Sequence, residues 1–249
     1  MLGSLQLGGR QAIRTRNRLA PESLHPDETV FFVHIPKCAG SSFRSVLKRW
    51  FSPDLMVLDT HRPQTFAEHF RAQAAPPRAI VGHFPFGLHD AVACRPYYLS
   101  LVRDPVDRFV SAYQHACDTE TNALHAAAAA LDLDKFYEHT LSDPQARRHT
   151  VGIQCQFLAG ARSFAQARDV VDDHYRLVAP IEAFDDFLAM TATLLGKAAA
   201  TAPRRNIRPI AAGLADAARR LEPRIRQEHK DDQLIYEHVV RRFAQTRRA

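Results

Sequence analysis

The sequence has no apolar run long enough to cross a membrane, and it has little cysteine. These two absences argue against membrane-spanning and disulfide-rich classes of protein. No hydrophobic stretch approaches the roughly 18 to 20 residues that a bilayer span requires. The N-terminal segment also lacks an apolar core of signal-peptide length. We therefore expect a cytoplasmic chain without a membrane span. The 4 cysteines are scattered without CxxC or Cys/His ligand spacing, which disfavours a disulfide framework and a zinc site.

Fibrous and low-complexity patterns are missing as well. The 249 residues are 46% hydrophobic and 24% charged, an ordinary globular composition that excludes disordered, collagen-like and coiled-coil classes. No internal repeat and no linker divides the chain. We expect a loose N-terminal arm over residues 1–28, followed by a single α/β domain over residues 29–249.

The excess of positive charge lies entirely near the C-terminus. Residues 200–249 carry 12 basic and 6 acidic side chains, whereas the two signs balance over residues 1–199. Such a segment can attract a polyanion or an anionic nucleotide. A solvated helix with ion pairs over residues 219–248 explains the same charges. The sequence leaves both interpretations open.

Short apolar runs alternate with helical patterns along the chain. Residues 29–35, TVFFVHI, are β-branched and aromatic throughout, as expected of a strand buried on both faces of a parallel sheet. Similar runs occur at 55–58, 79–82, 97–102 and 176–179. Helical patterns cover 41–51, 105–117, 126–130, 134–141, 144–158, 163–174, 184–195 and 230–246. The alternation predicts an α/β sandwich with a central, mostly parallel sheet flanked by helices and a helical C-terminal part.

The first strand runs through the tight loop PKCAGSS, residues 36–42, directly into a helix. Backbone N–H groups at a helix start attract an anion, and Lys37 adds a full positive charge. The loop therefore has the features of a phosphate site. It is not a Walker A loop, because the lysine precedes the glycine and GxxxxGK[ST] is absent. The alternative without a ligand is that Ser41 is simply a helix N-cap.

A second candidate site, RDPVDRFVS, follows the strand at 97–102 and occupies residues 103–111. Arg103 lies at the carboxyl end of this strand, where open α/β sheets bind ligands. Its guanidinium can hold a terminal phosphate in bidentate fashion, and Ser111 can complete the cradle. The aspartate and proline that follow Arg103 predict a helix start. We expect Arg108 to pair with Asp104 or Asp107 of that helix.

Three motifs now stand in order along the chain: VHIPKCAGSSF at 33–43, GHFPFGLH at 82–89 and SLVRDPVDRFVSAY at 100–113. Together they resemble sulfotransferases that use 3′-phosphoadenosine 5′-phosphosulfate (PAPS), in the branch of heparan sulfate 2-O-sulfotransferase and its bacterial relatives. The resemblance is strong over about residues 29–115. It implies a P-loop-like three-layer sandwich. It also implies metal-independent, in-line transfer of a sulfuryl group from PAPS to a hydroxyl acceptor, with a carbohydrate expected first.

The resemblance also implies roles for single residues. In the family, the first loop holds the 5′-phosphosulfate, the second motif holds the 3′-phosphate, and a basic loop near the C-terminus closes over the nucleotide. The matching positions are Lys37, Gly40, Ser41 and Ser42 for the first loop, Arg103 and Ser111 for the second, and Arg204 and Arg205 for the closing loop. A solvated loop between helices explains the last two equally well. Cys38 and the alanine after it stand where relatives often carry Thr-Gly, and we interpret Cys38 as a small loop residue.

An alcohol acceptor must lose its proton, and a histidine at the edge of the sheet suits that task. His83 follows the predicted strand at 79–82, and it matches the histidine that acts as base in the 2-O-sulfotransferase branch. We expect His83 and Lys37 to be the catalytic residues. His34 is the competing base and is placed to contact the co-substrate. His89 is expected to be structural.

Two other functions stay open at this stage. A non-catalytic module that binds nucleotides or polyanions would keep both loops but would not need a histidine at position 83. A nucleotide kinase is the weaker alternative, because it would need a Walker lysine and a carboxylate for magnesium. No nucleic acid partner is expected. The acceptor and the oligomeric state have no recognisable signal in the sequence.

Overall fold

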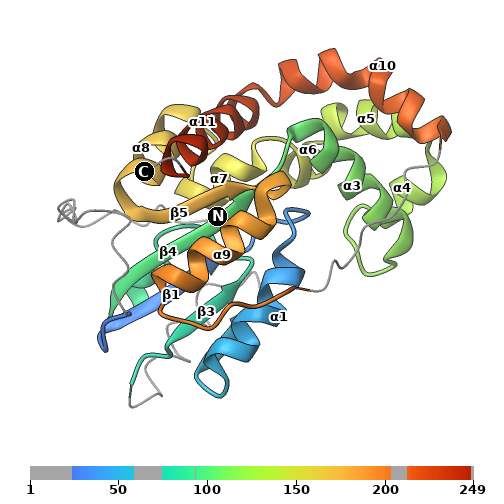
Figure 1. The fold of residues 1–249 in the computed structure, drawn as a ribbon. Helices are drawn as coiled ribbons and strands as arrows, with labels where there is room; N and C mark the ends of the chain where they lie inside the picture. The colour runs from blue at the N-terminus through green and yellow to red at the C-terminus, as the bar shows by residue number, and fades with distance from the viewer. Residues whose placement is uncertain (1–23, 59–74, 93, 203–211, 248–249) are drawn as a thin grey trace.

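The core of the protein is a five-stranded parallel sheet, seen in a computed structural model that describes residues 24–58, 75–92, 94–202 and 212–247 (Figure 1). The strands are β1 (Glu28–Val33), β2 (Leu55–Leu58), β3 (Ala79–Gly82), β4 (Arg95–Val102) and β5 (Tyr175–Pro180). They follow the order β2-β3-β1-β4-β5, and every pair is parallel. The predicted parallel sheet is confirmed, and the bounds of β2 and β3 match the apolar runs to the residue.

Strand β1 lies at the centre of the sheet and sets the position of the site. Residues 30–33 have no exposed surface, as expected of a strand covered on both faces. Val33, its last residue, lies beside Gly82 of β3 and Ser100 of β4. The carboxyl ends of three parallel strands therefore meet at one edge. Gly82 is required there, because a Cβ atom would lie 2.0 Å from the Leu58 carbonyl oxygen.

Helices cover both faces of the sheet (Figure 1). Helices α1 (Gly40–Phe51) and α9 (Phe184–Leu194) pack on one face, where Phe43 and Phe187 meet with ring centroids 5.0 Å apart. Helices α7 (Ile153–Ala159), α8 (Phe164–His174) and α11 (Lys230–Thr246) pack together on the other. This is the three-layer sandwich that the sequence predicted.

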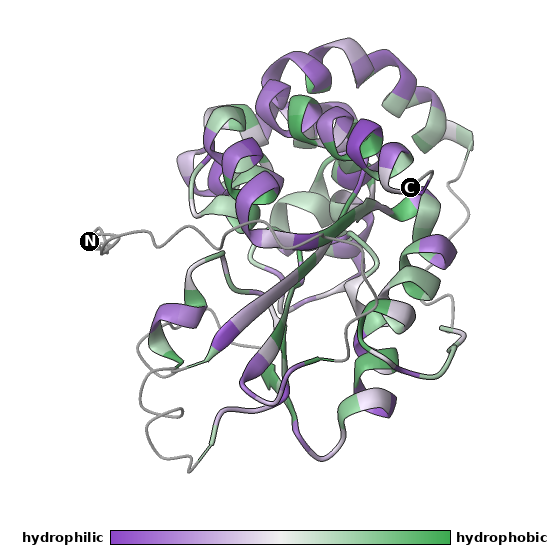
Figure 2. Ribbon diagram, turned by 60° about the vertical axis from the view of Figure 1, so that its left-hand side comes forward, coloured by the Kyte–Doolittle hydropathy of each residue, from purple (hydrophilic) through white to green (hydrophobic). Residues whose placement is uncertain are grey.

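A second group of helices lies beyond the sheet and has its own apolar cluster. The group comprises α3 (Pro105–Asp118), α4 (His125–Ala130), α5 (Leu133–Ser142), α6 (Pro144–Thr150) and α10 (Ala212–Glu228). Phe109, Phe136 and Ile225 are fully or almost fully buried among them. Figure 2 shows that the helices near the C-terminus carry mostly hydrophilic residues on their outer turns.

One helical prediction needs correction. The pattern over 144–158 predicts one helix, but the structure has α6 and α7 with a break between them. The break falls at Gly152, whose φ of 66° is a left-handed conformation that ends one helix before the next begins. No helix bounds were predicted for α10, which contains Pro223.

The basic C-terminal segment forms ion pairs with the second helical group. Arg220 pairs with Asp134 at 3.0 Å, and Arg224 pairs with Glu138 at 2.6 Å. These arginines are more than half exposed, so solvent screens both pairs and each contributes little to stability. A helix with ion pairs therefore accounts for this part of the positive charge, and the partners lie on a neighbouring helix.

The end of the expected N-terminal arm is attached to the sheet. Leu24 packs against the core, and the Arg78 guanidinium donates a 2.9 Å hydrogen bond to the His25 carbonyl oxygen. Residues 1–23 lie outside the described part of the chain. Of the helices that are described, none is long and apolar enough to cross a membrane.

Candidate functional site

The loop between β1 and α1 is bent by two left-handed residues. Lys37 has a φ of 70° and Ala39 a φ of 56°, which L-residues rarely adopt. Together they turn the chain so that α1 begins at once, with Ala39 at the N-cap position and no side chain capping the helix. The alternative in which Ser41 is only an N-cap is therefore wrong. The Ala39 carbonyl oxygen accepts from the backbone N–H groups of Ser42 and Phe43, at 3.1 and 3.4 Å, and N–H groups at such a helix start attract anions.

Gly40 is where this loop meets His34. A Cβ atom at position 40 would lie 1.8 Å from Cδ2 of His34, so only glycine fits against the imidazole. His34 is 9% exposed, and its backbone N–H donates to the Gly82 carbonyl oxygen at 3.0 Å. The predicted co-substrate residues Gly40 and His34 are thus in direct contact at the sheet edge.

His34 stacks on His83. Their ring centroids are 4.2 Å apart, with an angle of 29° between the ring planes. Burial lowers the pKa of His34 to about 3, and the positive charges of His83, Arg44 and Lys37 act in the same direction. The His34 ring is therefore neutral near physiological pH and a weak base.

The tautomer of His83 follows from its hydrogen bond to the backbone. Its Nδ1 lies 2.7 Å from the carbonyl oxygen of His34. A carbonyl oxygen can only accept, so Nδ1 carries the proton and Nε2 is the unprotonated nitrogen of the neutral ring. His83 is half-buried, at the end of β3. In this tautomer a proton taken up by the neutral ring goes to Nε2.

His89 has the structural place that the sequence suggested. Its Nδ1 lies 2.9 Å from the hydroxyl of Tyr98, a buried residue of β4. The same hydroxyl accepts hydrogen bonds from the backbone N–H groups of Gly87 and His89, at 3.3 and 3.4 Å. Tyr98 therefore anchors the GHFPFGLH segment to the sheet.

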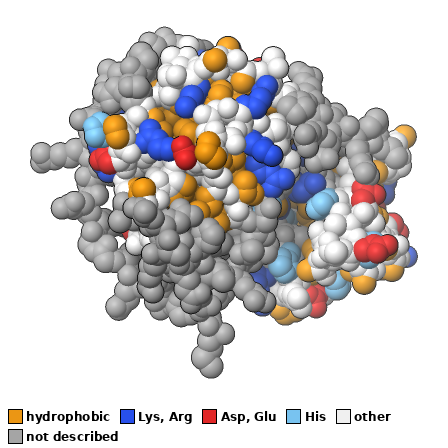
Figure 3. All heavy atoms as spheres, turned by 90° about the horizontal axis from the view of Figure 1, so that it is seen from below, with side chains coloured by type: hydrophobic (Ala, Val, Ile, Leu, Met, Phe, Trp, Pro, Cys, Tyr) orange, Lys and Arg blue, Asp and Glu red, His pale blue; other side chains and the backbone are white. Residues whose placement is uncertain are grey.

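Arg103 connects the two predicted motifs. Its guanidinium donates to the Lys37 carbonyl oxygen at 3.4 Å, so the side chain reaches the first loop. Its Nε–H is buried and has no partner among the described residues. A buried N–H of a cation without an acceptor is costly. Figure 3 shows lysine and arginine side chains among hydrophobic ones on the face seen from below, with histidines near some of them.

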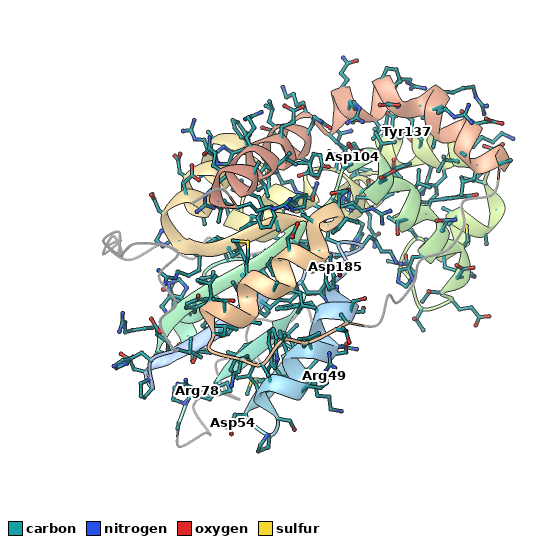
Figure 4. All side chains as sticks on the ribbon, in the orientation of Figure 1. Arg49, Asp54, Arg78, Asp104, Tyr137 and Asp185 are labelled. Atoms are coloured by element: carbon teal, nitrogen blue, oxygen red, sulfur yellow. The ribbon has the colours of Figure 1, made fainter. Side chains whose placement is uncertain are left out.

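The helix after Arg103 starts as predicted. Asp104 accepts hydrogen bonds from the backbone N–H groups of Val106 and Asp107, at 2.9 and 3.3 Å, and Pro105 occupies the first turn. Figure 4 labels Asp104 at this helix start, where it also pairs with Arg226 of α10 at 2.9 Å. Ser111 lies on α3 and is half-buried.

The prediction for Arg108 is wrong. Its guanidinium is 1% exposed and donates to the carbonyl oxygen of Thr150 at the end of α6, whereas Asp104 pairs with Arg226. The reason is that α3 packs against other helices, which places position 108 in the interior, away from the exposed aspartate at position 107.

Cys38 is the small loop residue that the sequence suggested. Its side chain is 1% exposed, and burial raises the pKa of the thiol to about 12. The thiol donates weakly to Oε1 of Gln154, with the sulfur and oxygen 3.8 Å apart. A reactive thiolate at the helix start is therefore excluded.

Sequence reasoning missed Gln154, a fully buried residue of α7. Its Nε2 donates to the Arg103 carbonyl oxygen, and its Oε1 accepts from the Arg103 backbone N–H, both at 2.9 Å. The only available signal was a polar residue at a helical position that the pattern assigns to the apolar face.

Of the other predicted residues, Ser42 is buried in the first turn of α1, while Arg204 and Arg205 lie outside the described residues.

Within the described ranges, no group of three or more histidine, cysteine or acidic side chains could hold a metal ion.

No curated protein matches the chain significantly in sequence. A sulfotransferase from Alicyclobacillus acidocaldarius is similar in structure, with 18% identity, a TM-score of 0.46 and coverage of 84% of this chain and 96% of that one. Mouse sulfotransferase SULT7A1 complexed with PAP is also similar, with 15% identity, a TM-score of 0.44 and coverage of 78% and 63%. The model of the sulfotransferase family matches residues 24–239, and the chain belongs to this family.

Proposed function

We propose that this protein transfers a sulfuryl group from PAPS to a hydroxyl acceptor, with a carbohydrate hydroxyl as the first candidate. The observation that carries the proposal is the contact between Arg103 and the Lys37 carbonyl oxygen, which joins two cationic loops at the edge where β1, β3 and β4 end. His83 follows β3 at the same edge. Membership of the sulfotransferase family supports the assignment.

The two loops suit the two ends of the nucleotide. The start of α1 and Lys37 offer N–H donors and a positive charge to the 5′-phosphosulfate, with Gly40, Ser41 and Ser42 lining the first turn. Arg103, directly after β4, offers its guanidinium to the 3′-phosphate. Ser111 is proposed to add its hydroxyl, and Arg204 and Arg205 are proposed to close over the nucleotide.

The reaction needs a base and a stabiliser of the leaving group. The acceptor hydroxyl gives its proton to Nε2 of His83 while its oxygen attacks the sulfur. The bond between sulfur and the bridging phosphate oxygen breaks, and negative charge moves to that oxygen. Lys37 is proposed to stabilise this charge at the position where it develops.

His83 is preferred to His34 as the base. The pKa of about 3 at His34 leaves that ring with little affinity for a proton, and the ring packs against Gly40. His34 is proposed instead to hold the His83 ring by stacking and through its carbonyl oxygen, and to contact the co-substrate. A non-catalytic nucleotide-binding module would not need a histidine held in this tautomer.

The experiment is a transfer assay with PAPS carrying radioactive sulfur. Purified protein is incubated with fractionated extract of the source cell, and both the labelled product and released adenosine 3′,5′-bisphosphate are quantified. We expect label in a hydroxyl-bearing product with the wild type and at least about a hundredfold less with His83→Ala. Bisphosphate release no faster than without enzyme, in every fraction, would overturn the proposal.

A further inference from the structure

The side-chain amide of Gln154 binds both backbone polar groups of Arg103. Its amide accepts from the Arg103 N–H and donates to the Arg103 carbonyl oxygen, each at 2.9 Å. These are the two bonds that a neighbouring strand would make, and β4 has already ended at Val102. The buried Gln154 amide therefore replaces a neighbouring strand for one residue beyond the end of β4, and that residue is Arg103.

The same amide also contacts the first loop. Its Oε1 accepts a weak hydrogen bond from the Cys38 thiol, with the sulfur and oxygen 3.8 Å apart. The Arg103 guanidinium donates to the Lys37 carbonyl oxygen of the same loop at 3.4 Å. The orientation of the amide is fixed by these partners, since two donors face Oε1 and one acceptor faces Nε2. Gln154 is thus a single side chain that touches both loops.

A residue of α11, Asp232, accepts a hydrogen bond from the first turn of helix α7. Its N-cap, Gly152, has no side chain to cap the helix, and the fully buried carboxylate of Asp232 accepts from the Cys155 N–H at 3.0 Å. A carboxylate at a helix N-terminus satisfies a free N–H and interacts favourably with the helix dipole. Asp232 therefore fixes the first turn of α7, from which Gln154 projects.

We propose that Gln154 is a positioning residue that holds Arg103 in the geometry needed to bind the 3′-phosphate, an inference that rests on the proposed function. Gln154 does not contact the nucleotide in this account. It acts by fixing the main chain from which the guanidinium extends, and Asp232 supports it by fixing α7. Gln154 thus controls how strongly the protein prefers a nucleotide that carries a 3′-phosphate to one that lacks it.

The test compares the affinities of adenosine 3′,5′-bisphosphate and adenosine 5′-monophosphate by calorimetry, so no acceptor is needed. Gln154→Met keeps the volume and removes both hydrogen bonds, and we expect bisphosphate binding to weaken about ten- to hundredfold. Binding of the monophosphate should change less than about threefold. Gln154→Asn keeps an amide in the interior but is too short to reach both backbone groups, and it should reduce the preference in the same way.

Leu158→Ala is the matched control, because Leu158 is fully buried in the same helix and makes no polar contact. It should lower the melting temperature and leave the ratio of the two affinities unchanged. If the wild type itself shows no preference for the bisphosphate, the proposed function is wrong. If the wild type prefers the bisphosphate and folded Gln154→Met and Gln154→Asn keep the same ratio, the positioning role alone is wrong.

Discussion

His34 and His83 form one unit: their rings stack with centroids 4.2 Å apart, and the His34 carbonyl oxygen lies 2.7 Å from Nδ1 of His83. The two contacts set different properties of the pair. The hydrogen bond fixes which nitrogen of His83 can take a proton, and the stacking keeps the neutral His34 ring between His83 and the loop at Gly40. Two histidines that compete for one role in the sequence thus have different surroundings in the structure.

Replacing His83 by alanine should lower turnover by about 10² to 10⁴ and change bisphosphate affinity little, because a base acts on the acceptor. The wild-type rate per folded molecule should fall as the pH drops through the range in which an imidazole takes up a proton. The variant should lose this limb of the pH–rate profile. His34, with a pKa of about 3, cannot produce that limb. A limb that persists in His83→Ala and disappears in His34→Ala would assign the base to His34 instead.

Lys37→Ala should lower turnover by about 10² to 10³, as for the loss of one donor that stabilises transition-state charge. Bisphosphate binding should weaken less, since the N–H groups of α1 stay in place. Lys48→Ala, an exposed lysine in the last turn of α1, is the control and should leave both quantities unchanged. Near-normal turnover in folded Lys37→Ala would contradict the role of the first loop.

Gly40→Ala should displace the His34 ring, because the added Cβ would lie 1.8 Å from it. We expect a loss of about 1 to 3 kcal/mol of stability and at least about a tenfold loss of turnover. Gly213→Ala is the control, since a Cβ at this helical position meets nothing within 4 Å. That variant should be unchanged or more stable by up to about 1 kcal/mol. Equal behaviour of the two variants in urea unfolding would contradict the close contact at Gly40.

The stability of the protein should fall in mild acid. Burial holds the pKa of His34 and of His229 at about 3, whereas an unfolded histidine titrates near 6.5. Because the folded pKa is the lower one, the unfolded chain takes up protons first as the pH falls below about 6.5. Each histidine should then reduce the free energy of unfolding, by up to roughly 2 kcal/mol at pH 5, and have no such effect above about pH 7.5.

Urea unfolding of His229→Phe at pH 7 and pH 5 isolates one of these groups. The variant keeps a flat ring against Phe109, whose centroid lies 5.9 Å from that of His229, but it cannot titrate. We expect it to lose less stability than the wild type between the two pH values. An identical loss in both proteins would show that His229 does not contribute.

Much of the fold could be predicted because buried parallel strands carry an obvious signal. The apolar run at 79–82 ends at a glycine, and β3 has these bounds in the structure. Asp104 and Pro105 mark the start of α3 by local chemistry alone, since a cap and a fixed φ act within one turn. Lys37, His83 and Arg103 could be placed near one another because each follows a parallel strand.

The rest depends on tertiary packing, which a local pattern does not contain. Arg108 looks like a partner for an aspartate of its own helix, but the helices around α3 bury it against Thr150. Gln154 is distant from Arg103 in sequence, and only the fold brings its amide against that backbone. Pro223 is tolerated within α10, although a proline usually ends a helix.

Calorimetric titration of the wild type with adenosine 3′,5′-bisphosphate and with adenosine 5′-monophosphate, both without magnesium, tests the proposed nucleotide site most directly. We expect a dissociation constant on the order of micromolar for the bisphosphate and at least about tenfold weaker binding of the monophosphate. Arg103→Ala should remove this difference, because Arg103 is the residue assigned to the 3′-phosphate. Equal affinity of the wild type for the two nucleotides, or binding that requires magnesium, would show that the proposed PAPS site is wrong.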